Sequence, residues 1–307
     1  MMRKLLVFTA AILLSIAATC YSASPGLWAQ WILDSHHVSG NTLTSIQGLP
    51  GFTDGTAVWV DGPGGRWYRM DGLSNHFVMY SGASGGLDLP STAISIEAWG
   101  MVQESRDWSS FVNFIQDNGS HERGWILGTR GGAFMFGIAS VRDGKNEPYL
   151  TYMTADRPYE HGKWYHVAGV YDGKTMKLYV DGRLAAECDY QYGAIAYPAE
   201  GTLAVGAYVD SNEQCNLAGA VREVRIYGRA LTASEVQKSV PGFGGLLGSG
   251  KTEGIPVRLM MVDGSSIEGI LVGTDGTILL IEVGAGAEVS ILRMDSMQVK
   301  SVLLWAR

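Results

Sequence analysis

Short runs of apolar and β-forming residues, separated by polar and glycine-containing turns, cover most of the chain. Residues 164–171 read Trp-Tyr-His-Val-Ala-Gly-Val-Tyr and residues 175–180 read Thr-Met-Lys-Leu-Tyr-Val, and both are rich in the residue types that strands favour. Comparable runs predict strands at 93–102, 124–128, 133–138, 202–209 and 220–227. Many short strands with turn signals about every 8–12 residues are typical of a β-sandwich or barrel.

Asp-Gly pairs mark the expected turns. The chain has eight of them, which begin at Asp54, Asp61, Asp71, Asp143, Asp172, Asp181, Asp263 and Asp275. Both residue types tolerate positive φ, so such a pair between two apolar runs is a strong hairpin signal. The pairs at Asp172 and Asp181 predict that residues 175–180 form a strand between two hairpin turns.

The character of the chain changes near its last quarter. Thr232 or Ser234 can cap a short helix that runs to about Lys238. Residues 241–254 are rich in glycine and predict a flexible linker. Five compact apolar runs follow, at 257–262, 266–272, 277–283, 288–293 and 298–304. They predict a small β-barrel-like module over 255–307, because closure into a barrel removes exposed sheet edges.

The first 23 residues have the pattern of a secretory signal peptide. Arg3 and Lys4 precede an apolar run over 5–18, and small residues follow up to Ala23. The run is shorter than the roughly 20 residues that a transmembrane helix needs. Cys20 leaves open the alternative of a lipidated N-terminus. We therefore expect a secreted, periplasmic or cell-envelope protein with no transmembrane segment in the mature chain.

Composition and charge narrow the choice of partners. Glycine accounts for 41 of 307 residues, beside 9 tryptophans and 14 tyrosines, as expected of a turn-rich β protein. The formal net charge is −7. Nucleic-acid binding needs a basic surface, so this acidic chain argues against a nucleic-acid partner.

Three segments occur in the order and spacing of a known family. They are residues 95–99, which read Ser-Ile-Glu-Ala-Trp, residues 164–182 and residues 217–232. Together they resemble the laminin-G-like jelly-roll family, part of the concanavalin-A-like lectin and glucanase superfamily. The resemblance implies an all-β, two-sheet antiparallel jelly-roll sandwich over 24–240. It also implies an extracellular domain that is usually used for binding rather than catalysis.

The tail resembles Sm-like small β-barrels, through residues 257–259, the turn at Asp263 and a strand that contains Gly269. Such proteins bind RNA through basic and polar loops. From residue 241 onward this chain has 5 basic and 7 acidic residues, which disfavours RNA. An adaptor or packing module is the better interpretation.

Many members of the laminin-G-like family carry a calcium site at the rim, formed in part by acidic residues. This chain has Arg222 at one of those positions and Asn75 near another. Calcium prefers about six to eight oxygen ligands, usually with several carboxylates, and an arginine would repel it. We expect no calcium at the inherited position, although Asp71 and Asp88 could serve a shifted one.

Two motifs bear on catalysis and on nucleotide binding. Retaining glucanases of this superfamily typically show ExDxxE, which directs the acids into one cleft, and this sequence lacks it. Residues 245–252 match the P-loop pattern GxxxxGK[ST]. A P-loop must follow a strand and open a helix, whereas Pro241 precedes this segment and Pro256 follows it. We therefore expect neither catalytic residues nor a bound nucleotide.

Aromatic residues in predicted loops are the candidate ligand-binding residues. Tyr190, Tyr192 and Tyr197 fall in one loop and Trp108 in another. Exposed rings can stack on sugars, and loops at the rim of a jelly roll commonly carry function. The alternative is that these rings cover sheet edges or pack on the core.

Cys188 and Cys215 are the two cysteines that follow the N-terminal segment. In an oxidising compartment they could form a disulfide, or they could remain two separate thiols. Neither lies in a CxxC motif, so a metal or redox site is not indicated.

These features favour an exported, non-catalytic binding module for a carbohydrate or a cell-surface partner. One alternative is a structural or scaffold protein of the cell envelope. Another, with less support, is a glycan-active hydrolase that uses unfamiliar acids.

Overall fold

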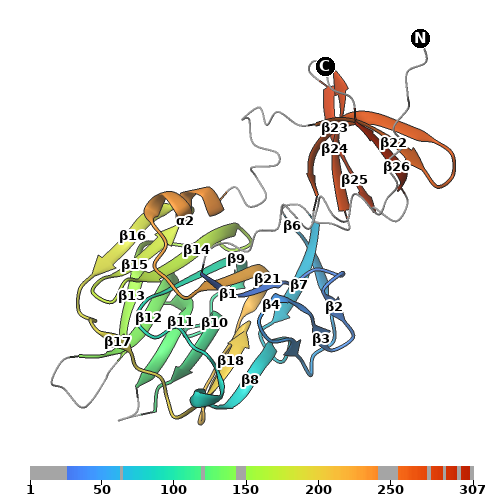
Figure 1. Cartoon of the computed structure of the whole chain (residues 1–307). Coiled ribbons are helices and arrows are strands. Elements are labelled where there is room, and N and C mark those ends of the chain that lie inside the picture. The colour runs from blue at the N-terminus through green and yellow to red at the C-terminus, as the bar shows by residue number, and fades with distance from the viewer. Residues whose placement is uncertain are drawn as a thin grey trace. The chain divides into compact units, whose positions relative to one another are not determined.

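The computed structural model describes residues 26–62, 65–118, 122–142, 150–240, 255–274, 278–285, 288–295 and 299–304. Residues 26–240 belong to one compact unit and residues 255–304 to another. The predicted signal peptide, Cys20, the linker at 241–254 and the P-loop-like motif lie outside the described residues. The first unit is a sandwich of two large antiparallel sheets (Figure 1), which confirms the predicted all-β fold.

The first sheet has nine strands, with β16-β15-β14-β9-β21-β1-β4 in order and β7 and β6 attached beside β21. Its central pairings are antiparallel, and Glu97 of β9 lies opposite both Ala168 of β14 and Arg225 of β21. Its strands are β1 (Leu27–Ile32), β4 (Ser45–Gln47), β6 (Trp59–Gly62), β7 (Gly65–Asp71), β9 (Ile94–Glu104), β14 (Trp164–Tyr171), β15 (Met176–Val180), β16 (Arg183–Cys188) and β21 (Ala218–Tyr227).

The second sheet has ten strands in the order β13-β12-β11-β10-β18-β8-β5-β3-β2, with β17 paired to β12. A hairpin of β19 (Ala207–Val209) and β20 (Gln214–Asn216) follows β18. The strands of the sheet are β2 (Val38–Ser39), β3 (Thr42–Leu43), β5 (Gly51–Phe52), β8 (Phe77–Ala83), β10 (Ser110–Gln116), β11 (Arg123–Arg130), β12 (Ala133–Val141), β13 (Leu150–Pro158), β17 (Ala194–Ile195) and β18 (Glu200–Val205). A short 3-10 helix, η1 (Ser84–Gly86), follows β8.

The main core lies between the two sheets and is built from alternate residues of each strand. On β9 the side chains of Ile94, Ile96 and Ala98 belong to it, and on β12 those of Phe134 and Phe136 do. A strand directs successive side chains to opposite faces, so this period-2 pattern buries one face of each sheet.

The outer face of the ten-stranded sheet carries a second apolar cluster. Ile115, Ile126 and Met135 belong to it, and Trp108 and Tyr152 pack against it. The strand residues of this cluster alternate with residues of the main core. Part of this sheet is therefore buried on both faces, and its strands read as almost continuous apolar runs.

The hairpin between β15 and β16 confirms the prediction from Asp-Gly. Asp181 and Gly182 have φ of 49° and 74°, and Val180 pairs with Arg183 across them. Positive φ at both central residues defines the two-residue turn that matches the twist of antiparallel strands. The strand predicted at 164–171 is β14.

The single strand predicted over 202–209 is wrong, because β18 ends at Val205 and β19 begins at Ala207. Gly206 between them has a φ of 87°, and its N–H donates to the carbonyl of Phe111. A left-handed residue cannot continue a strand, so the glycine turns the chain.

The short helix α2 (Ala233–Ser239) begins as predicted. Thr232 is its N-cap, and Thr232 and Glu235 form a capping box. Its buried residue Val236 packs in a small cluster with Ala168 and Tyr179 on the outer face of the nine-stranded sheet (Figure 1). The helix therefore covers one part of that face.

The second unit contains a five-stranded antiparallel sheet in the order β25-β24-β23-β22-β26. Each strand overlaps one of the predicted apolar runs, and Gly264 has a φ of 89° in the turn after β22. The described pairings run from β25 to β26 without joining them, so closure into a barrel stays a prediction. The strands are β22 (Ile255–Met261), β23 (Ser266–Thr274), β24 (Ile278–Ala285), β25 (Glu288–Asp295) and β26 (Val299–Leu304).

Candidate functional site

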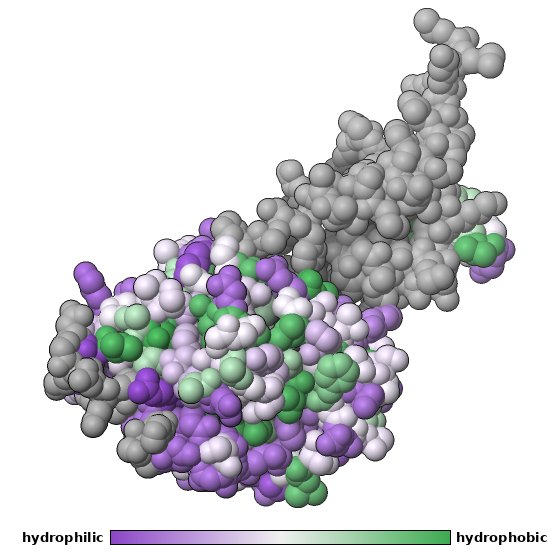
Figure 2. Space-filling view, turned by 60° about the horizontal axis from the view of Figure 1, so that its bottom comes forward, coloured by the Kyte–Doolittle hydropathy of each residue, from purple (hydrophilic) through white to green (hydrophobic). Residues whose placement is uncertain are grey.

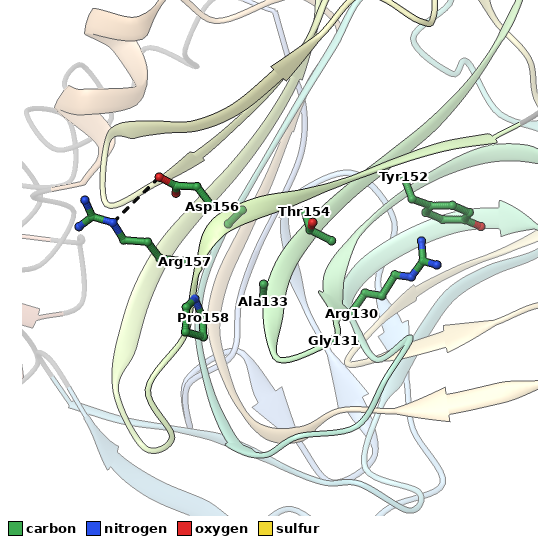
Figure 3. A pocket seen from close by; sticks show the side chains of 9 residues that line it. Arg130, Gly131, Ala133, Tyr152, Thr154, Asp156, Arg157 and Pro158 are labelled. Atoms are coloured by element: carbon green, nitrogen blue, oxygen red, sulfur yellow. Dashed lines mark ion pairs between the residues drawn. The ribbon is translucent and has the colours of Figure 1, made fainter.

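An open depression of about 580 Å³ lies at the edge of the ten-stranded sheet. It is formed by the edge strand β13 and by the turn between β11 and β12. Figure 3 shows Arg130 and Tyr152 at one end, Asp156 and Arg157 at the other, and Thr154 between them. The residues that line it are Arg130, Gly131, Ala133, Tyr152 and residues 154–158.

Two rings and one guanidinium form a cluster at the first end. The Arg130 guanidinium lies over the Trp108 ring, 4.5 Å from its centroid, and 5.9 Å from the centroid of Tyr152. The rings of Trp108 and Tyr152 meet edge to face at 5.0 Å. These are favourable geometries for cation–π and aromatic contacts. The predicted residue Trp108 is thus brought next to the depression.

Trp108 adopts a strained backbone conformation. Its φ is 66°, a left-handed value that is uncommon for a bulky residue. Its N–H donates to the carbonyl of Thr129 at 3.0 Å, and the neighbouring hydroxyls of Ser109 and Thr129 lie 2.8 Å apart. Such strain persists only where the surroundings enforce it, and it clusters at functional sites.

Tyr152 is fixed in place by its hydroxyl. The phenol O–H donates to Oδ2 of Asp117 at 2.5 Å, and the backbone N–H of Asp117 donates to Oδ2 of Asp210 at 3.2 Å. Burial, together with the Asp117 carboxylate, raises the pKa of Tyr152. The phenol therefore stays neutral, and its ring presents a constant surface to the depression.

The opposite end of the depression is polar. Arg183 of β16 binds the Asp156 carboxylate through two contacts of 2.7 and 3.1 Å, and Nε of Arg157 lies 4.0 Å from the same carboxylate. The hydrogen bond from Arg183 lowers the pKa of Asp156. Asp156 is therefore an ionised acceptor, and the exposed hydroxyl of Thr154 lies next to it along the depression.

Tyr190 and Tyr192 lie on a separate loop that a buried glutamine anchors. Gln191 is fully buried, and its Oε1 accepts from the N–H and the hydroxyl of Ser140 at 2.9 and 2.5 Å. Its Nε2 donates to the hydroxyl of Thr151 at 2.8 Å. Tyr190 and Tyr192 on either side are 66% and 39% exposed. The loop thus presents two rings to solvent around one inward side chain.

The two groups of predicted rings lie toward opposite ends of β12. The N–H of Trp108 bonds to Thr129, which is paired with Phe134 near the start of β12. The N–H of Tyr192 bonds to the hydroxyl of Ser140 near its end. Six residues of strand separate these attachment points, a distance of roughly 20 Å. The structure does not bring the predicted rings into one site.

Tyr197 lies apart from both groups. Its hydroxyl donates to the carbonyl of Pro90 at 2.7 Å, and its ring meets Phe114 edge to face at 5.9 Å. It packs against the main core. Tyr197 thus fits the alternative in which a predicted ring packs on the core.

Cys188 and Cys215 are both free thiols in the structure. The thiol of Cys188 lies 3.8 Å from Sδ of Met176 at the edge of the main core. Cys215 instead packs against the outer apolar cluster of the ten-stranded sheet. The two side chains thus belong to different layers of the sandwich, which leaves the alternative of separate thiols.

Three of the positions considered for calcium make contacts within the protein. The Arg222 guanidinium is buried 5.3 and 5.4 Å from the ring centroids of Trp67 and Trp99. Asn75 uses its amide to donate to the carbonyl of Thr56 at 2.9 Å. The Asp71 carboxylate accepts three backbone N–H groups. Within the described residues no group of three or more acidic, cysteine or histidine side chains is arranged to hold a metal ion.

Two buried acids lie on the outer face of the nine-stranded sheet. Glu223 accepts from Gln30 at 2.7 Å and from Arg225 at 2.5 Å. Glu97 accepts from the Ser239 hydroxyl at 3.2 Å, and its other oxygen lies 3.3 Å from Nε2 of His166. Both carboxylates are almost inaccessible to solvent, and their partners are protein groups. Their arrangement is that of a structural polar network.

Sequence reasoning missed the residues that shape the depression. Arg130 is the last residue of β11, and Gly131 begins the turn after it, which has no Asp-Gly pair. Tyr152 and Thr154 belong to β13, a strand that the pattern did not predict. A search for aromatic residues alternating with polar ones over 150–158 would have flagged Tyr152. Nothing in the sequence alone places it beside Trp108.

Residues 79–237 match the family model described as the concanavalin A-like lectin/glucanases superfamily. The chain is also 27% identical over 161 residues to pappalysin-1 of Mus musculus, a match that covers 49% of this chain and 10% of that protein. It is 29% identical over 126 residues to pappalysin-1 of Homo sapiens, covering 36% and 7%. The chain therefore spans about a tenth or less of the length of these relatives.

Among solved structures, the chain is similar to domain 4 of AbnA, a GH43 extracellular arabinanase from Geobacillus stearothermophilus, in complex with arabinotriose. The TM-score is 0.50 and the identity 21%, over 69% of this chain and 97% of that domain. This likeness shows a shared fold. No helix among the described residues has the length and apolar character needed to span a membrane. Because the family model matches 159 of 307 residues (79–237), the chain belongs to the concanavalin A-like lectin/glucanase superfamily.

Proposed function

We propose that this protein is an exported, non-catalytic module that binds a glycan in the depression beside β13. The superfamily includes lectins, and the arabinanase domain with the similar fold was solved with arabinotriose bound. The observation that carries the proposal is the depression itself. It brings together the ring of Tyr152, which Trp108 supports edge to face from beside the depression, the hydroxyl of Thr154 and the ionised carboxylate of Asp156.

The chemistry of these groups suits a sugar. Aromatic rings offer apolar area to the C–H faces of a pyranose at little entropic cost. Hydroxyl and carboxylate oxygens can bond the sugar hydroxyls and fix the orientation of the ring. A depression that is open on one side accepts an internal segment of a longer glycan as readily as its end.

The acids of the first unit support a role without catalysis. Glycosidases use two carboxyl groups that flank the scissile bond, about 5–9.5 Å apart. Asp156 is the one carboxylate among the described lining residues of the depression, and Arg183 engages it. Glu97 and Glu223 are buried in a polar network away from solvent.

Replacement of Thr154 by tyrosine tests the location of the site. Thr154 is exposed in the middle of the depression, so a ring there would fill the space while suiting a strand. We expect glycan binding to weaken by about tenfold or more, equivalent to roughly 1.4 kcal/mol. Binding is measured by isothermal titration calorimetry with the glycan that scores highest on an array.

The matched control is Ser81→Tyr, which places the same ring at an exposed position of β8 in the same sheet. It should leave both stability and glycan affinity unchanged. Equal affinities for the wild-type protein and the Thr154→Tyr variant would show that the depression is not the binding site.

The Tyr190–Tyr192 loop is a second candidate surface, because both rings are exposed and held by buried Gln191. With the ligand in the depression, the double change Tyr190→Ala and Tyr192→Ala should alter glycan affinity less than twofold. A large loss of affinity in the double variant, with none in Thr154→Tyr, would instead place the ligand at this loop.

A further inference from the structure

Arg130 is an exposed arginine whose guanidinium is oriented by neighbouring aromatic rings. Its guanidinium lies 4.5 Å from the centroid of the Trp108 ring. Within the described part of the chain, no ion pair or side-chain hydrogen bond involves it. A guanidinium stacked on a ring keeps the N–H groups in its own plane available. Arg130 therefore presents a fixed fork of donors at one end of the depression.

The backbone is strained at Trp108, the residue on which Arg130 stacks. Trp108 holds a φ of 66°, a left-handed value that a bulky residue keeps only where its surroundings enforce it. Tyr152 completes the support through its bond to Asp117. The indole and the phenol thus hold the arginine in place before any ligand arrives, which reduces the entropic cost of binding.

The other charges near the depression leave Arg130 available. The Asp107 carboxylate accepts the N–H of Gly131 at 2.8 Å, and Asp156 is engaged by Arg183. Arg157 supplies a second cation at the far end, where its side chain is 75% exposed. The cations that line the depression outnumber its carboxylate by two to one, on a chain whose formal net charge is −7.

From this geometry we propose that the depression takes an acidic glycan, whose sugar carboxylate is bound bidentately by Arg130. This inference rests on the proposed function, because it names the class of glycan for the same site. Arginine matches the planar carboxylate with two parallel N–H···O bonds, which a lysine cannot reproduce. Arg157 attracts a second acidic unit of the same glycan, and the formal net charge of −7 on the protein disfavours contact with acidic polymers elsewhere.

The test uses an array of hyaluronate, alginate and polygalacturonate oligosaccharides. Each is printed beside its neutral form, in which the carboxyl groups are reduced. We expect acidic forms to bind the full chain and the reduced forms to bind about tenfold more weakly or worse. Arg130→Gln should remove this preference, and Arg130→Lys should retain only a small part of it. Arg66→Gln is the matched control, because it removes an exposed arginine of β7 that lies outside the depression.

The outcomes separate this inference from the proposed function. In one outcome, neutral forms bind as well as acidic ones, Arg130→Gln has no effect and Thr154→Tyr abolishes binding. The acidic class is then wrong, and the glycan site stands. If Arg66→Gln weakens binding as much as Arg130→Gln, general charge attraction explains the preference and the role of Arg130 is overturned. If neither acidic nor neutral oligosaccharides bind, both proposals fail together. Circular dichroism of each variant confirms that the fold is retained.

Discussion

Replacement of Glu223 by alanine is expected to lower the free energy of unfolding of the sandwich by about 3–5 kcal/mol. The carboxylate is almost fully buried on β21, where it accepts from Gln30 at 2.7 Å and from Arg225 at 2.5 Å. Arg222, next in the chain, contacts it at 3.5 Å. Without Glu223, the two neighbouring guanidinium groups would lose the carboxylate that both contact.

The electrostatic balance of this network explains the size of the effect. Burial lowers the pKa of Arg222 to about 9, while the charge of Glu223 opposes that change. Burial also disfavours the charged form of Arg225, but Glu223 more than compensates and raises its pKa overall. The carboxylate therefore keeps both arginines charged inside the protein, and its removal exposes the full cost of their burial.

Urea unfolding followed by tryptophan fluorescence measures this effect, and Glu187→Ala is the matched control. Glu187 pairs with Lys177 at 3.5 Å on the surface, where its side chain is 47% exposed. A surface pair contributes only about 0–1 kcal/mol. Equal losses of stability in Glu223→Ala and Glu187→Ala would contradict a structural role for the buried network.

Replacement of Gly219 by alanine is the second change with a large expected effect, about 3 kcal/mol of destabilisation. Gly219 lies at a bulge of β21 opposite β9. A Cβ at this position would lie 1.9 Å from the carbonyl oxygen of Met101. That oxygen belongs to the backbone of the neighbouring strand, so no side-chain rotation can relieve the clash. Relief requires the central strand pair to separate.

Gly85→Ala is the control for the second prediction. A Cβ on Gly85 meets no atom within 4 Å, so we expect a change within about 0.5 kcal/mol. Thermal unfolding monitored by circular dichroism compares the two variants. An unchanged melting temperature for Gly219→Ala would mean that the bulge accepts a side chain without separating β21 from β9.

The fold could be predicted from the sequence where local signals and tertiary packing agree. Residues 164–171 form β14 with the predicted bounds, because alternating apolar residues end at an Asp-Gly turn. The strand β10 was missed, since Asn113 and Ser110 interrupt its apolar pattern. Asn113 is nevertheless fully buried, and its amide donates to the carbonyl of Ala207. That contact depends on the β19–β20 hairpin, and the residues of β10 alone give no sign of it.

The candidate site could be predicted only in part. Trp108 stood out as an aromatic residue in a polar loop, but its partners Arg130 and Tyr152 come from two other segments. Strand register brings them together, and register depends on pairings that a single sequence does not reveal. Tyr197 was grouped with Tyr190 and Tyr192 by proximity in sequence. The chain turns between them, so that Tyr197 is partly buried against Phe114 while the other two are exposed.

The buried amide of Gln191 holds the backbone of its loop in place, while the side chains on either side of it face solvent. Ser140 and Thr151 hold this one side chain, so the identities of its two neighbours are not dictated by folding. Substitution on either side can therefore diversify recognition while the scaffold stays intact. Insertion or deletion of a single residue would have the opposite consequence, because it would exchange inward and outward positions. The loop therefore tolerates a change of residue type at positions 190 and 192 but not a change of length.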